Sequence, residues 1–225
     1  VEFAKHADVY EIELVTGQKI KATDFTHFDA ILSVTPYYNK PTQEGLKAHF
    51  SEVANAAPIP VILYNVPSRT GVNMLPKTTL EIAHSHPNVI GIKEAKGDME
   101  QIAQLLSSKP EGFLVVSGDD ATAYQTTLAG GSGVISVIGQ AIPAQFSDLI
   151  HSALKGHSSE ANRLNEQLQD LIEAIFEEGN PCGVKALMNI LDSYPLQVRL
   201  PLVPASVELQ NKLKNSLRIL GSLVS

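Results

Sequence analysis

Several classes of protein are excluded by what the sequence lacks. Its one cysteine, Cys182, cannot form a disulfide within the chain. Lysine and arginine never form a run, and the net charge of -7 comes from interspersed charges, so no nucleic-acid partner is expected. The longest apolar runs, 113–116 and 134–138, are far shorter than the roughly 20 residues of a membrane span. With no charged and apolar leader before the first structured segment, we expect no membrane partner and a cytoplasmic location.

The pattern of apolar residues predicts parallel β-structure. The 225 residues, 44% of them apolar, can bury one sizeable core. From about residue 28, short apolar runs alternate with helical patterns, which is typical of βαβ units. The runs are continuous, as expected when both faces of a parallel sheet are covered. We expect strands at 30–34, 61–64, 89–93, 113–117 and 133–137.

Helical spacing of three and four residues fills the segments between these strands and most of the chain after them. Asp98 is expected to be a helix N-cap and Pro76 to lie in a first turn. The predicted helices cover residues 43–55, 76–84, 98–107, 120–129, 142–154, 158–177, 181–192 and 204–220.

Residues 9–22 fit two structures. They can form a hairpin that turns at Thr16 and Gly17, or an amphipathic helix that carries Ile12, Val15 and Ile20 on one face. Periodicity does not decide between the two.

Lys93 ends the apolar run 89–93 and is the first candidate for chemistry. Burial at a strand end would lower its pKa toward the free amine, which can attack a ketone. The alternative is a lysine whose stem covers apolar surface while its charge reaches water.

Two further loops follow strands, where parallel barrels build their active sites. Tyr64 ends one strand and Arg69 follows five residues later; a phenol can relay a proton and a guanidinium can bind a carboxylate. The alternative is a simple turn with a surface charge. Tyr37 and Tyr38 lie between two prolines, a pattern more typical of packing or an interface.

Glycine-rich stretches end or begin the last two strands, at 117–120 and 130–136, where a ligand could approach the backbone closely. Neither fits a dinucleotide or phosphate-binding motif. His84 and His86 have no third ligand at a suitable spacing, so no metal is expected, and Cys182 is interpreted as a packed small residue.

Five motifs in this order resemble the dihydrodipicolinate synthase family, within the N-acetylneuraminate lyase superfamily. They are residues 34–41 (VTPYYNKP), 63–71 (LYNVPSRTG), 91–95 (GIKEA), 117–120 (SGDD) and 133–137 (GVISV). The resemblance runs from about Phe25 to the C-terminus and implies an α/β fold, the (β/α)₈ TIM barrel with a C-terminal helical appendage. The barrel portion would cover residues 1–155, incomplete at 1–27, and the helical region residues 156–225.

The resemblance implies a lyase of lysine (diaminopimelate) biosynthesis that condenses pyruvate with aspartate-4-semialdehyde and needs no cofactor. Lys93 matches the Schiff-base lysine, Tyr64 a proton-relay tyrosine, and Arg69 the residue that binds the semialdehyde carboxylate. Backbone at Gly118 and Ile135 would lie near the pyruvate adduct. Tyr38 matches a relay tyrosine from the neighbouring subunit, with Tyr37 at the same contact of a dimer or tetramer.

The five strands match the family's fourth to eighth, and the first three, with a Gly-Thr-Thr-Gly-Glu loop, have no counterpart. Residues 1–8 align with the end of the second barrel helix and 10–25 with the third, which suggests a discontinuity near Asp8 and Val9. We expect that segments of a longer chain are missing, because an open sheet would expose its interior and two edges. The alternatives are an inactive truncated chain, or a neuraminate or keto-sugar-acid lyase of the same superfamily.

Overall fold

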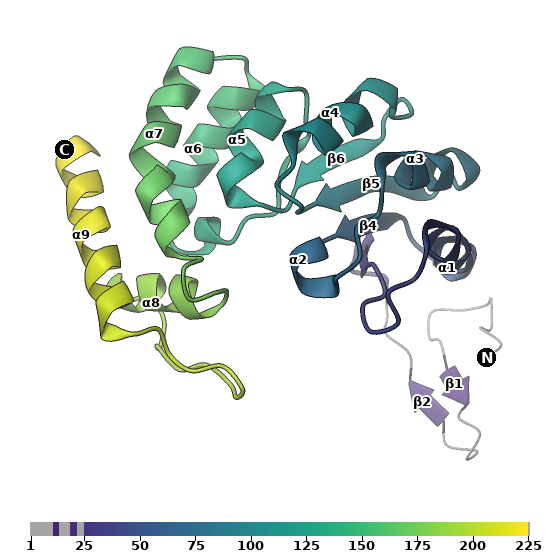
Figure 1. Cartoon of the computed structure of the whole chain (residues 1–225), viewed down its shortest axis with the longest axis horizontal. Helices are drawn as coiled ribbons and strands as arrows, with labels where there is room; N and C mark the ends of the chain where they lie inside the picture. The colour runs from purple at the N-terminus through teal and green to yellow at the C-terminus, as the bar shows by residue number, and fades with distance from the viewer. Residues whose placement is uncertain (1–10, 14–18, 22–24, 225) are drawn as a thin grey trace. The chain divides into compact units, whose positions relative to one another are not determined.

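The computed structural model describes residues 11–13, 19–21 and 25–224 (Figure 1). A five-stranded sheet has the strand order β3-β4-β5-β6-β7, in which β3 pairs with β4, and β6 with β7, in parallel. All five strands were predicted, although the last is shorter than the expected 133–137. The strands are β3 (Ile31–Val34), β4 (Val61–Asn65), β5 (Val89–Glu94), β6 (Leu114–Ser117) and β7 (Gly133–Val134).

The predicted helices are confirmed with ends shifted by a few residues. Local signals explain their starts: Asp98 Oδ1 accepts from the N–H of Gln101 at 3.2 Å, and Pro76 occupies the first turn of α3. The long helices are α1 (Gln43–Ala56), α3 (Pro76–Ser85), α4 (Met99–Ser108), α5 (Asp120–Leu128), α6 (Pro143–Leu154), α7 (Ser158–Ala174), α8 (Cys182–Ile190) and α9 (Val207–Val224), with a short α2 (Pro67–Thr70) and a 3₁₀ helix (Ile138–Gln140). No helix in the described part of the chain has the length and apolar character to cross a membrane.

A hairpin precedes the sheet. Strand β1 (Glu11–Glu13) pairs antiparallel with β2 (Lys19–Lys21), with Ile12 opposite Ile20. The alignment of residues 10–25 with a barrel helix is therefore wrong for these six residues, because their backbone groups bond across strands. The expected discontinuity near Asp8 and Val9, and the helix end at 1–8, lie outside the described residues.

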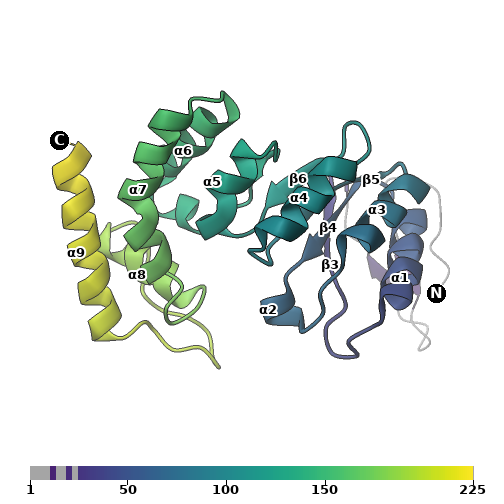
Figure 2. The ribbon, with the colours of Figure 1, turned by 45° about the horizontal axis from the view of Figure 1, so that its top comes forward.

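The chain forms two compact units, and the first comprises Val1–Ile92 with Ser108–Phe113. Within it, helices α1 and α3 lie together on one side of β3 and β4 (Figures 1 and 2). Leu46 and Phe50 of α1, Leu63 of β4 and Ile82 of α3 are buried between these layers. Leu32 and Val34 alternate with the inward side chains of β3 and are exposed. Tyr64 is opposite Val34 in the register and so shares that second face.

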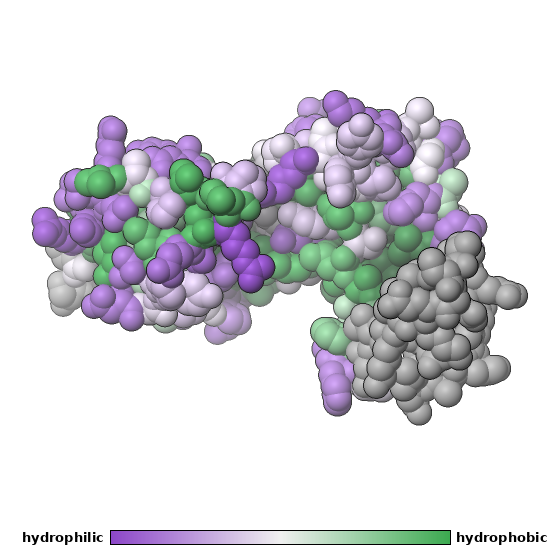
Figure 3. All heavy atoms as spheres, turned by 90° about the horizontal axis from the view of Figure 1, so that it is seen from below, coloured by the Kyte–Doolittle hydropathy of each residue, from purple (hydrophilic) through white to green (hydrophobic). Residues whose placement is uncertain are grey.

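The second unit comprises Lys93–Ser107 with Leu114–Ser225. Its core lies among helices α5 to α9 and includes Phe146, Leu168, Leu171, Leu187 and Leu213. Apolar side chains also reach the surface in both units (Figure 3). The expected boundary between residues 155 and 156 stays a prediction.

Gly183 in α8 gives a direct test of packing in this second unit. A Cβ atom there would overlap the carbonyl oxygen of Ile175 and lie 2.6 Å from its carbonyl carbon, both of which are backbone atoms. We expect Gly183→Ala to lower the free energy of unfolding by about 1–3 kcal/mol, measured by urea denaturation. Gly221→Ala in α9 is the matched control, because its Cβ meets nothing within 4 Å, and it should be neutral or stabilise slightly. Equal effects of the two changes would contradict this packing.

Candidate functional site

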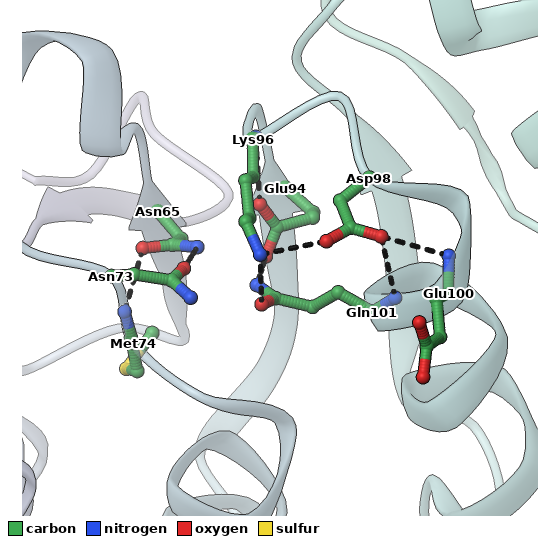
Figure 4. Close-up of polar contacts among 8 residues, drawn as sticks. All are labelled: Asn65, Asn73, Met74, Glu94, Lys96, Asp98, Glu100 and Gln101. Carbon is green, nitrogen blue, oxygen red and sulfur yellow. Dashed lines mark hydrogen bonds and ion pairs between the residues drawn. The ribbon is translucent and has the colours of Figure 1, made fainter.

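Strand β5 ends with two residues that project to opposite faces. Glu94 is 1% exposed and faces α4, where its Oε2 accepts from Gln101 Nε2 at 2.9 Å (Figure 4). Its Oε1 accepts from the Lys96 N–H, in the loop before α4, at 2.8 Å. Because side chains alternate along a strand, Lys93 projects from the other face, away from α4. The buried carboxylate therefore fixes the direction in which the lysine leaves the sheet.

Gly118 lies against the stem of Lys93. Its N–H donates to the Glu94 carbonyl at 2.7 Å, which brings the end of β6 beside the end of β5. A Cβ atom on Gly118 would lie 2.8 Å from Lys93 Cε and 2.8 Å from Ala95 Cβ. Residue 118 therefore has to be glycine while the lysine stem keeps this position.

Ile135 lies beyond the last strand of the sheet. Its N–H donates to the Ser117 carbonyl at 2.9 Å, so its backbone lies next to the residue before Gly118. The expected strand 133–137 ends at Val134 because the next N–H groups, those of Val137 and Ile138, donate to the carboxylate of Asp120. Three predicted site residues, Lys93, Gly118 and Ile135, thus fall in the second unit.

Strand β4 repeats the arrangement of β5 at its own end. Asn65 is fully buried; its Oδ1 accepts from the Met74 N–H and its Nδ2 donates to Asn73 Oδ1, each at 2.9 Å (Figure 4). Gln43 of α1 extends the network, because its Nε2 donates to the Asn73 carbonyl at 2.9 Å. Tyr64 precedes Asn65 and therefore projects from the opposite face.

The segment after Tyr64 is a short helix rather than only a turn, which corrects the simplest interpretation of this motif. Pro67 begins α2, and Gly71 ends it with a left-handed backbone at φ 67°. Arg69 lies on this helix, with an exposed side chain that is close enough to act electrostatically on Tyr64. Burial raises the pKa of the Tyr64 phenol above its ordinary value, and the positive charge of Arg69 partly opposes this.

Tyr37 and Tyr38 lie in the turn between β3 and α1. Both side chains are exposed, that of Tyr38 to 90%. The Lys40 N–H closes the turn on the Tyr37 carbonyl at 3.3 Å, and the Lys40 stem passes 3.2 Å from the Cβ position of Gly71. The predicted residues Tyr38, Tyr64 and Arg69 thus fall in the first unit.

The other candidate residues have local roles. His84 Nδ1 lies 2.6 Å from the Leu80 carbonyl in its own helix, and His86 Nε2 lies 2.9 Å from Ser51 Oγ. Cys182 is a buried free thiol at the start of α8, as its interpretation as a packed residue predicted.

Sequence reasoning missed the polar residues that hold the strand ends, namely Asn65, Glu94 and Asp120. For Asn65 and Glu94 the available signal was a polar residue directly after an apolar run, at a position whose alternation points it into the helix layer; no such signal marks Asp120, which begins α5. Such a residue has to be hydrogen-bonded when it is buried.

Comparisons with known proteins agree with this fold. The sequence profile of the dihydrodipicolinate synthetase family matches residues 13–220. A 4-hydroxy-tetrahydrodipicolinate synthase of Flavobacterium psychrophilum is 52% identical over 196 residues, which cover 87% of this chain and 67% of that protein. The crystal structure of dihydrodipicolinate synthase from Thermotoga maritima aligns with a TM-score of 0.83 and 41% identity, over 86% of this chain and 66% of that one. The structure of the Acinetobacter baumannii synthase complexed with pyruvate aligns with a TM-score of 0.82 and 39% identity, over the same shares.

The chain has the α/β fold of these TIM-barrel lyases, which confirms the predicted fold class. It belongs to the dihydrodipicolinate synthetase family. The chain spans about two thirds of the length of the relatives that it matches.

Glu94→Gln tests the buried anchor at the end of β5. An amide has one acceptor oxygen where the carboxylate has two, so an NH₂ group would face one of the two present donors. We expect the free energy of unfolding to fall by about 1–3 kcal/mol in urea denaturation. Glu100→Gln, with an exposed side chain in the same segment, is the control and should change it by less than about 0.5 kcal/mol. An unchanged stability of Glu94→Gln would show that the carboxylate does not hold this loop.

The phenol of Tyr64 should ionise above its ordinary pKa of 10.0. Because burial favours the neutral form, the contribution of this group to stability is complete below the unfolded pKa and is lost as pH rises toward the folded pKa. The measurement is the phenolate absorbance of the protein minus that of its Tyr64→Phe variant across pH. Arg69→Gln should move the midpoint of this difference further up, and a downward movement would contradict the assigned geometry.

Proposed function

We propose that the protein carrying this chain condenses pyruvate with aspartate-4-semialdehyde to give 4-hydroxy-tetrahydrodipicolinate, through a Schiff base on Lys93. The observation that carries the proposal is the position of Lys93, which ends β5 on the face opposite α4 with its stem against Gly118. The names of the family and of the Flavobacterium psychrophilum relative support the same reaction.

Lys93 is the proposed nucleophile. Its amine attacks the ketone carbon of pyruvate, and loss of water from the carbinolamine gives an iminium. The iminium withdraws electrons from the neighbouring methyl group, so that a proton leaves and an enamine forms. The enamine carbon then bonds to the aldehyde carbon of the second substrate, whose oxygen takes up a proton and becomes the hydroxyl group of the product. The amino group of that substrate attacks the restored iminium carbon, closes the ring and displaces Lys93 as the free amine. The adjoining backbone of Gly118, and that of Ile135 beyond Ser117, is proposed to border the pyruvyl group.

Tyr64 and Arg69 are proposed to serve the same reaction. The Tyr64 phenol, whose pKa burial raises above 10.0, is protonated at neutral pH and can donate and accept a proton in a relay. The Arg69 guanidinium, exposed on α2, can bind a substrate carboxylate through two parallel hydrogen bonds.

Tyr38 is proposed to act in a neighbouring subunit of a dimer or tetramer, with Tyr37 at the same contact. Its side chain is exposed within its own chain, as a group that serves another subunit has to be. A cytoplasmic location, compatible with the free thiol of Cys182, stays a prediction.

Borohydride reduction tests the proposal. Incubation of the full-length protein with pyruvate and borohydride should add one reduced pyruvyl group to Lys93, located by peptide mass spectrometry. Lys93→Arg should remove the adduct, whereas Lys77→Arg, with an ion-paired lysine exposed on α3, should keep it. An adduct on another lysine, or none on folded protein, would refute the proposal. Turnover with aspartate-4-semialdehyde, rather than with keto-sugar acids, separates this synthase from other pyruvate aldolases.

A further inference from the structure

Asp120 is a buried acid outside the predicted site. It begins α5 two residues after Gly118, and it is 2% exposed. Its Oδ2 accepts from the Ile138 N–H at 2.8 Å and from the Val137 N–H at 3.0 Å. Burial raises the pKa of this carboxyl, while the hydrogen bonds from Ile138, Ser136 and Val137 lower it in part. The buried Asp120 side chain thus binds two backbone N–H groups of the segment after β7.

These bonds determine where β7 ends and how its following segment runs. The Ile135 N–H still bonds to Ser117 in the sheet pattern, whereas the next N–H groups turn to Asp120. Beyond them the 3₁₀ helix Ile138–Gln140 begins, closed by the Gly139 N–H donating to Ser136 Oγ at 2.8 Å. Ile135 is therefore held on one side by Ser117 and on the other by the anchored residues 137 and 138.

The other end of the same short segment reaches Lys93. Asp120 and Gly118 are separated only by Asp119, whose side chain caps α5 by accepting from the Thr122 N–H at 3.1 Å. Gly118 is the residue against which the Lys93 stem lies. One short turn, residues 118–120, thus connects the lysine to the segment that carries Ile135.

We propose that Asp120 is a positioning residue that holds the backbone of Ile135 at a fixed place beside Gly118, so that the pyruvyl group on Lys93 meets a preformed wall. The inference rests on the proposed function, because it requires that the Ile135 backbone borders a pyruvyl group bound to Lys93. The Asp120 carboxyl group accepts hydrogen bonds from two adjacent backbone donors, an arrangement that is strongest when the acceptor is ionised. Small displacements of such a wall are costly, since a shift of about 1 Å can reduce a rate about hundredfold.

Asp120→Asn in the full-length protein tests this role. The change keeps the side-chain volume, but an NH₂ donor replaces one of the two carboxylate oxygens, which lie 3.0 and 3.2 Å from the Val137 nitrogen, so that a donor would face the backbone N–H. We expect the pyruvate concentration that gives half-maximal borohydride trapping at Lys93 to rise about tenfold or more, with a smaller change in the KM for the aldehyde. Asp119→Asn is the matched control, because asparagine caps helices as well as aspartate does. Asp120→Asn and Asp119→Asn behaving alike would overturn the proposal.

A second measurement does not depend on activity. Amide hydrogen exchange in a peptide that covers residues 135–138 should be about tenfold faster in Asp120→Asn than in the unchanged protein. Ser136→Ala removes the side-chain hydrogen bond to Asp120 and the acceptor of the Gly139 N–H, but it keeps the carboxylate that binds the Val137 and Ile138 N–H groups, so it should shift exchange in the same direction by less. Unchanged exchange in both variants refutes the positioning role. Faster exchange with no pyruvyl adduct in the unchanged protein would refute the proposed function and leave the anchoring in place.

Discussion

Alternation at the ends of two strands is the constraint on which the candidate site depends. In β4 and in β5 the last residue turns into the helix layer and is held there by hydrogen bonds, as Asn65 and Glu94 show (Figure 4). The residue before each must then project from the opposite face, and these residues are Tyr64 and Lys93. The direction of a chemically important side chain is thus set by a neighbour that never touches substrate.

The side chains of Asn65 and Glu94 are costly to bury without hydrogen-bond partners, and they therefore favour one conformation of the chain. A carboxylate or amide without partners in the core costs several kcal/mol, so each of these side chains stabilises only the one conformation that satisfies it. Glu94 requires the Lys96 N–H and the Gln101 amide together, which defines the path of the chain from β5 to α4. At the next strand end, glycine at 118 leaves room for the Lys93 stem beside that path.

The sequence predicted the parts of the fold that depend on local patterns. Continuous apolar runs located all five strands, and Asp98 and Pro76 located helix starts, because these signals lie within a few residues of their effect. Lys93 was a candidate from its place at a strand end, the family motifs gave Lys93 and Gly118 their expected roles, and the two residues lie against each other. For residues 9–22 the periodicity allowed either a hairpin or a helix, and the family alignment favoured a helix. The structure shows a hairpin at 11–13 and 19–21.

The remaining features depend on partners far along the chain. The end of β7 at Val134 follows from Asp120, which binds N–H groups 17 and 18 residues later, and no local propensity encodes that bond. The α2 helix is only four residues long, from Pro67 to Thr70, and a few hydrogen bonds, such as that from the Gly71 N–H to the Pro67 carbonyl, distinguish it from a turn. Neither the role of Asn65 nor that of Glu94 could be assigned before their partners were known.

A crystal structure of the Gly118→Ala variant beside that of the unchanged protein tests this account most directly. We expect the unchanged protein to hold the Lys93 stem against Gly118, with Glu94 bound to the Lys96 N–H and to Gln101. In the variant the new methyl group should displace the lysine stem, because the two would otherwise lie 2.8 Å apart. A variant in which Lys93 keeps its position, or an unchanged protein in which Glu94 faces away from α4, would contradict the account.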